Sequence, residues 1–104
     1  MDAGAKPDLA NAMGVTPSMT AAKIDDFQAV LRLLDRGASP YAADERGVSL
    51  AFLTGLSNLA SNNPQGQARD EVAARLQRAG VPWPPPAPQD LLALKAAGRW
   101  PPSR

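Results

Sequence analysis

The sequence predicts an all-α fold built from stacked helical hairpins. The tripeptide Gly-Val-Thr at residues 14–16 returns as Gly-Val-Ser at residues 47–49, a spacing of 33 residues. Helix-capping residues followed by apolar residues at helical spacing occur in both halves of the chain. The helical stretches end at Gly37 and Gly80, which suit the left-handed residue after a helix. A chain of 104 residues is long enough for one domain, residues 1–104.

The first helix is expected to run from Pro17 to about Lys23. Thr16 can accept a hydrogen bond from a free N–H of the first turn, and proline at the first helical position has no N–H to satisfy. Ala21 and Ala22 are small, so a neighbouring helix can approach this one closely.

A second helix is expected after Asp25, which we predict as its N-cap, with Gln28 completing a capping box. Basic Arg32 and Arg36 lie toward its end and complement the helix dipole. Its apolar residues recur at i, i+3, i+4 and i+7 and form one stripe: Phe27, Val30, Leu31 and Leu34. This periodicity predicts an amphipathic helix with one buried side.

The second unit is expected to begin at Gly47, with Ser49 as the cap of its first helix. Its second helix is predicted in residues 71–80. Because Leu76 and Gly80 follow their first-unit counterparts by 43 residues, ten residues have been inserted, and the turn-forming segment 57–70 is their expected place. We expect the insertion to lengthen the first helix and the loop after it.

Beyond Gly80 the repeat pattern ends. Residues 81–89 hold five prolines and are expected to form an extended linker, followed by a capping helix at residues 90–98 with Leu91, Leu92, Leu94 and Lys95 near its packing side. Trp83 and Trp100 are expected to fasten the proline segment to the helices. Residues 7–13 are expected to form a short helical turn over the first unit.

The residues of the first unit resemble an ankyrin repeat, a 33-residue unit of two antiparallel helices and a β-turn. Matching positions are Gly14, Thr16, Pro17, Ala21, Ala22, Val30, Leu33, Leu34, Gly37, Ala38 and Asp44. Departures are Ser18 and Met19 in place of Leu-His, Asp25 in place of the inter-helix glycine, and Tyr41 where asparagine is usual. The resemblance implies an ankyrin-like α-solenoid with repeat 1 at residues 14–46, repeat 2 at residues 47–80 and a capping helix.

The composition argues against catalysis and cofactors. Cysteine and histidine are both absent, which removes thiolate nucleophiles, the commonest metal ligands and the usual proton-transfer side chain. The carboxylate pairs Asp25/Asp26 and Asp44/Glu45 are adjacent in sequence and suit structural roles. We therefore expect no enzyme activity, no metal and no cofactor. A net charge of +1 and the lack of a long apolar run predict neither a nucleic-acid nor a membrane partner. A cytoplasmic location is the default, and the Ala, Arg and Pro bias suggests a bacterial source.

What the resemblance implies is protein binding through the concave side and the turn tips. The candidate partner-binding residues are Met19, Thr20, Lys23, Tyr41, Glu45, Arg46, Leu53 and Leu56. Core packing is the alternative for Leu53 and Leu56, and anchoring of the loop is the alternative for Tyr41. Two units are few for a repeat array, so the end caps, a homodimer formed through an open end, or the partner itself would have to supply further stability.

The favoured hypothesis is a non-catalytic protein–protein binding module that neutralises a partner, as an immunity protein, antitoxin or inhibitor does. The alternatives are a secreted effector, an adaptor, or display of the proline-rich segment 85–88, a PxxP pattern, to an aromatic groove. A nucleic-acid binder using the basic C-terminal segment is a third hypothesis, which the near-neutral charge disfavours.

Overall fold

The computed structural model describes residues 9–102 of the chain, and these residues form five helices. In chain order these are α1 (Pro17–Lys23), α2 (Phe27–Asp35), α3 (Leu50–Leu56), α4 (Pro64–Arg78) and α5 (Pro88–Ala96). Within this part of the chain the only β pairing is an isolated antiparallel bridge between Ala43 and Ser49. The predicted all-α class is confirmed.

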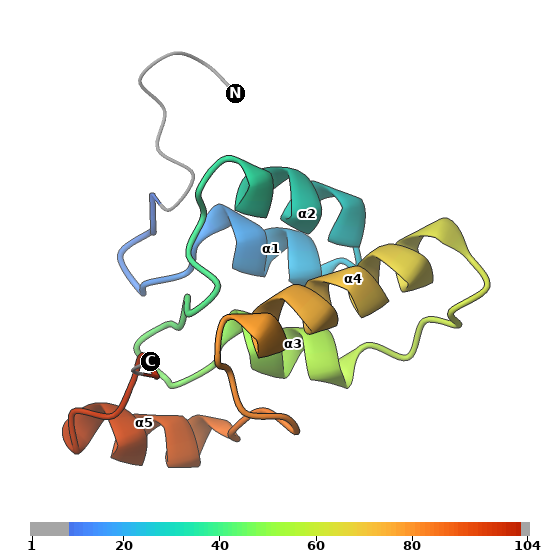
Figure 1. Cartoon of the computed structure of the whole chain (residues 1–104). Coiled ribbons are helices and arrows are strands. Elements are labelled where there is room, and N and C mark those ends of the chain that lie inside the picture. The colour runs from blue at the N-terminus through green and yellow to red at the C-terminus, as the bar shows by residue number, and fades with distance from the viewer. Residues whose placement is uncertain (1–8, 103–104) are drawn as a thin grey trace.

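Two helical hairpins, α1 with α2 and α3 with α4, pack side by side (Figure 1). The shorter helices α1 and α3 contact each other, and so do the longer helices α2 and α4. Helix α5 lies apart from the four, below α3 in the view of Figure 1. The arrangement places the first helix of each unit in one row and the second helix in another.

The 33-residue echo has an atomic basis in two equivalent turns. The side-chain oxygen Oδ1 of Asp44 accepts hydrogen bonds from the backbone N–H groups two and four residues further on, at 2.9 and 3.0 Å. Asn11 makes the same two bonds at 2.9 and 3.1 Å. Gly14 and Gly47 then take left-handed φ angles of 86° and 89°. Each turn therefore rests on an Asn or Asp side chain that replaces backbone hydrogen bonds, followed by the glycine that its geometry requires.

Both short helices begin as their sequences predict. Thr16 Oγ1 accepts from the N–H of Met19 at 3.3 Å, and Ser49 Oγ accepts from the N–H of Phe52 at 2.9 Å. Helix α1 spans the predicted residues 17–23, with proline in its first turn. Capping is a local interaction, which is why sequence spacing alone located these starts.

Helix α2 begins one residue later than predicted. Asp26 is the N-cap, and its Oδ1 accepts from the N–H of Ala29 at 3.2 Å. Asp25, the predicted cap, has a φ of 59° and reverses the chain between the two helices. Aspartate tolerates the left-handed region better than most residues with a side chain, so it can occupy this turn in place of glycine. No capping box forms, since the Gln28 N–H donates instead to Gln65 of α4.

The insertion lies in α4 and in the loop before it, and the expectation that it lengthens α3 is wrong. Helices α1 and α3 have seven residues each, whereas α4 has 15 and α2 has nine. The start of α4 was predicted at residue 71, but Asn63 caps it, accepting from the N–H of Gly66 at 2.8 Å, and Pro64 follows at the first helical position. An Asn-Pro pair suits a turn and a helix start equally well.

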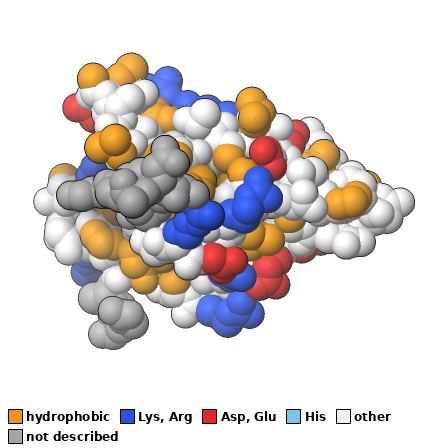
Figure 2. Space-filling view, turned by 90° about the horizontal axis from the view of Figure 1, so that it is seen from above, with side chains coloured by type: hydrophobic (Ala, Val, Ile, Leu, Met, Phe, Trp, Pro, Cys, Tyr) orange, Lys and Arg blue, Asp and Glu red, His pale blue; other side chains and the backbone are white. Residues whose placement is uncertain are grey.

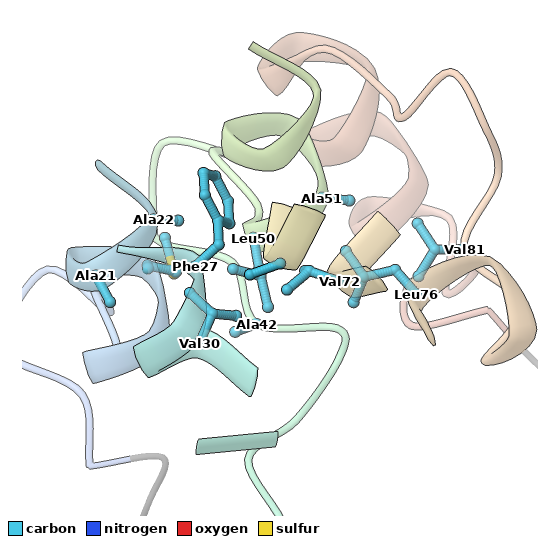
Figure 3. Close-up of a cluster of buried hydrophobic side chains, with 12 residues drawn as sticks. Ala21, Ala22, Phe27, Val30, Ala42, Leu50, Ala51, Val72, Leu76 and Val81 are labelled. Carbon is cyan, nitrogen blue, oxygen red and sulfur yellow. The ribbon is translucent and has the colours of Figure 1, made fainter. Parts of the chain in front are cut away.

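The core lies between the two hairpins and receives side chains from all four of their helices (Figure 3). Its largest fully buried members are Met19, Phe27, Val30, Leu50, Val72 and Leu76. Leu31 and Leu34 of the predicted apolar stripe pack against this core while remaining partly exposed. Burial of the α2 stripe against α4 is what joins the first hairpin to the second.

The C-terminal segment 81–102 folds back along α3. A Cβ atom added to Gly55 would lie 3.3 Å from Pro85 Cγ, and one added to Gly47 would lie 2.2 Å from the Pro88 carbonyl oxygen. The prolines thus run in close contact with α3, and Pro88 opens α5 two residues before the predicted start.

Helix α5 is fixed by one side chain and by the tail that follows it. Leu91 is fully buried, whereas Leu92 and Lys95, also predicted near the packing side, are exposed. Trp100 fastens the tail by donating its indole N–H to the Tyr41 carbonyl at 3.2 Å. At the other end of the chain, residues 9–13 make a turn without helix, and residues 7–8 of the predicted helical turn lie outside the described part.

Candidate functional site

The structure separates the eight predicted partner-binding residues into five groups. Met19 has no exposed surface and belongs to the core, so it cannot form part of an external contact surface. Its predicted assignment to the surface is wrong because the inner side of α1, at this position, faces α2 and the core instead of solvent.

Tyr41 is half-buried and serves as an anchor for the turn. Its hydroxyl donates to the carbonyl oxygen of Ala79, just beyond α4, and its ring meets Trp100 edge-to-face at a centroid distance of 6.3 Å. These contacts tie the turn, the end of α4 and the C-terminal tail together. The alternative of a loop anchor therefore describes Tyr41 better than a free contact residue.

Lys23, Leu53 and Leu56 meet in one open pocket of about 380 Å³ at the C-terminal ends of α1 and α3. The α1–α3 packing brings these ends together, and the loop that follows α3 supplies the remaining wall. Leu56 is 58% exposed, while Leu53 is half-buried and also packs on the core. We call this cavity the inner pocket; its other lining residues are Ala22, Asp25, Ser57, Asn58 and Leu59.

The inner pocket combines an apolar floor with one positive and one negative side chain. Lys23 and Asp25 are both exposed, and neither pairs with an oppositely charged group among the described residues. Charged groups that have no internal partner are free to pair with a ligand or with solvent ions. The chemistry suits an amphipathic segment that brings one apolar side chain and a polar flank.

Glu45 and Arg46 are exposed at the tip of the second turn, above the buried side chain of Asp44. Burial alone would raise the pKa of the Asp44 carboxyl. The Arg46 guanidinium at 3.0 Å and the backbone N–H groups of Val48 and Arg46 together lower it by more than burial raises it, so the pKa lies below its ordinary value. Asp44 is thus ionised at neutral pH and partly fixes the direction of the Arg46 side chain. The tip lies at the opposite end of α3 from the inner pocket.

Thr20 is exposed but belongs to a different surface. It lines a hollow on the far side of α1, together with Ile24 and residues from α2, and not the inner pocket. The structure therefore brings together three of the predicted residues, places two at the turn tip, and leaves Met19, Thr20 and Tyr41 elsewhere.

Sequence reasoning missed two residues of the inner pocket and one residue of the repeated turn. Asn58 and Leu59 wall the inner pocket from the irregular loop after α3, and no periodicity marks such a loop. Asn11, the counterpart of Asp44 in the repeated turn, could have been found, since it lies 33 residues before Asp44.

The described residues hold no group of three or more carboxylates that could bind a metal ion. Within each predicted carboxylate pair the two residues have different environments. Asp26 caps α2 and Asp44 holds the turn, whereas their neighbours Asp25 and Glu45 are exposed. Across residues 9–102 every helix is too short or too polar to cross a lipid bilayer.

Comparison of the chain with protein-family models, with curated protein sequences and with solved structures finds no match. The ankyrin resemblance thus remains a prediction from the sequence, and the functional argument depends on the geometry described above.

Proposed function

We propose that the chain is a non-catalytic protein-binding module whose inner pocket receives a segment of a partner polypeptide. The observation that carries the proposal is the convergence of Lys23, Leu53 and Leu56 on one open cavity, with Leu56 left largely exposed. An exposed apolar side chain inside a concave site is a feature of surfaces that bind other molecules.

The partner segment places an apolar side chain against Leu53 and Leu56, and a flanking acidic group pairs with Lys23. The turn tip with Glu45 and Arg46 makes a second, polar contact, for which Arg46 is already oriented by Asp44. Arginine and apolar anchors are residue types that carry much of the binding energy at protein interfaces.

The ankyrin resemblance supports the same function, because repeats of that family bind proteins through their first helices and turn tips. Within this class we favour a bacterial neutralising protein in the cytoplasm, which inactivates a partner by occupying its surface. A secreted effector or an adaptor would use the same pocket.

Display of the proline segment as a PxxP ligand is less well supported. Pro85 contacts α3 at Gly55, and Pro88 lies in the first turn of α5, so the two outer prolines of the pattern are engaged within the chain. A groove that recognises PxxP needs both on an accessible extended helix.

A library of random linear peptides displayed on phage tests the proposal without knowledge of the natural partner. We expect the wild-type chain to select a family of peptides with an apolar residue beside an acidic one. These peptides should bind Leu56→Asp at least about tenfold more weakly, because a hydrated carboxylate replaces the apolar surface that the peptide's apolar side chain would cover.

Ile24→Asp is the matched control, since it changes an exposed aliphatic residue outside the inner pocket. The control should bind the selected peptides as the wild type does. Equal binding to Leu56→Asp would refute the assignment to the inner pocket.

A further inference from the structure

The two ends of the hairpin pair differ in what covers them. Beyond α3, the proline segment and α5 occupy the outer side, where Pro88 touches Gly47 and Leu91 is fully buried. Gly47 meets Pro88 in the same way that Gly14 meets Asp44 of the second turn. The C-terminal segment therefore takes the place that the turn of a third unit would occupy.

The opposite end is formed by the outer sides of α1 and α2. Among the described residues, only residues 9–11 lie over it. It holds an open hollow of about 630 Å³, and the residues that line it carry no charged side chain. Leu9 and Ile24 are 72% and 73% exposed there, and Leu33 is half-buried. Figure 2 looks onto this end and shows hydrophobic side chains with charged ones beside them. We call this surface the open end.

The internal repeat shows what a face of this kind packs against. Asp44 and Leu50 of the second unit are buried by the first unit, with 1% and 0% exposure. Their counterparts 33 residues earlier, Asn11 and Pro17, line the hollow of the open end and are exposed and half-buried. The open end thus repeats a hairpin-packing surface without its neighbouring hairpin.

We infer that the open end binds the open end of a second copy of this chain, forming a closed two-fold dimer. A head-to-tail assembly would need the other end of the second copy, and segment 81–102 already covers that end. Only like-to-like contact remains, and such an isologous interface closes after two subunits. The dimer unites four hairpins, which exceeds the roughly three units that repeat arrays need for stability.

The charges at the two ends of α2 fit this symmetry. Helix α2 starts beside the exposed Asp25 and ends with the exposed Arg32 and Arg36, and none of the three forms an ion pair within the chain. A two-fold axis perpendicular to α2 sets the two copies of this helix antiparallel. The acidic start of each helix then faces the basic end of the other, and the helix dipoles oppose each other favourably.

Sedimentation equilibrium of the full chain tests the dimer, over concentrations from about 5 to about 500 µM. We expect the mass to rise from that of the 10.9 kDa chain to twice that value and to stop there. Ile24→Asp, and separately Arg36→Glu, should each raise the dissociation constant at least about tenfold. Leu56→Asp, a similar change in the inner pocket, should leave it unaltered, so failure of the dimer and failure of the proposed function are distinguishable.

Circular dichroism establishes that the variants are folded, which the exposure of Ile24 and Arg36 leads us to expect. A wild-type chain that stays monomeric throughout the range overturns the inference. So does a mass that grows beyond the dimer, or a dimer that Leu56→Asp weakens as much as Ile24→Asp does.

Discussion

Asp44 and Asn11 hold equivalent turns, and their substitution separates the contribution of burial from that of hydrogen bonding. Asp44 has a side chain with no exposed surface and accepts from two backbone N–H groups and from the Arg46 guanidinium. Asn11 accepts from two equivalent N–H groups but is exposed. The repeat therefore provides its own control.

Asp44→Ala leaves two N–H groups without an acceptor in a place that water reaches poorly. Each such group costs about 1–3 kcal/mol when buried, and because both bonds are only part-buried we expect a loss in the lower half of the combined range, about 2–4 kcal/mol in the free energy of unfolding. Asp44→Asn keeps an oxygen for both N–H groups and loses only the bond to Arg46, whose side chain is 58% exposed, which predicts a loss of about 1 kcal/mol or less. Asn11→Ala exposes its N–H groups to water and should also cost about 1 kcal/mol or less.

Urea unfolding followed by circular dichroism at 25 °C measures all three variants. The expected order of destabilisation is Asp44→Ala well above Asp44→Asn and Asn11→Ala. If Asp44→Asn proves as destabilising as Asp44→Ala, the charge and not the paired backbone groups holds the turn. If Asn11→Ala equals Asp44→Ala, burial by the first hairpin has no role, and the reasoning is refuted.

Three further predictions concern the turn, the insertion and the anchor. The folded-state pKa of Asp44 is lowered, so its carboxylate stabilises the fold fully above the ordinary carboxyl pKa near pH 4, and this stabilisation is lost as the pH falls through the folded-state pKa. Acid titration should therefore show a shallower loss of stability below about pH 4 in Asp44→Asn than in the wild type. Gly66→Ala should lower the unfolding free energy by about 1–3 kcal/mol in urea unfolding, since its Cβ would lie 1.8 Å from the Ala60 carbonyl oxygen; an unchanged midpoint would contradict this close approach. Tyr41→Phe should cost about 1 kcal/mol through the lost bond to the Ala79 carbonyl, and no change on thermal unfolding would mean that the hydroxyl is equally well bound by water.

The parts of the fold that the sequence predicts well depend on contacts between near neighbours. Thr16 and Ser49 cap their helices, and Gly37 and Gly80 end theirs in the left-handed conformation, with φ angles of 97° and 99°. Each of these features is decided within about one helical turn, so the residue type and its spacing suffice.

The parts that the sequence predicts poorly depend on distant contacts. Whether Met19 or Leu56 is buried is decided by how α1, α3 and the loop before α4 meet, and both residues suit either environment. The start of α4 is ambiguous for a different reason, because an Asn-Pro pair begins turns as readily as helices. The inner pocket follows from the position of Asn58 and its neighbours, which no periodic pattern specifies.

The proposed binding site, the inner pocket, exists only because α1 and α3 pack together. Its most direct test is a ¹H–¹⁵N correlation titration of the wild-type chain with a selected peptide. Backbone shifts confined to Lys23, Leu53, Leu56 and the loop at 57–59 are the predicted result. Shifts that centre on α5, or on Ile24 and the open end, with the inner pocket unmoved, would contradict it.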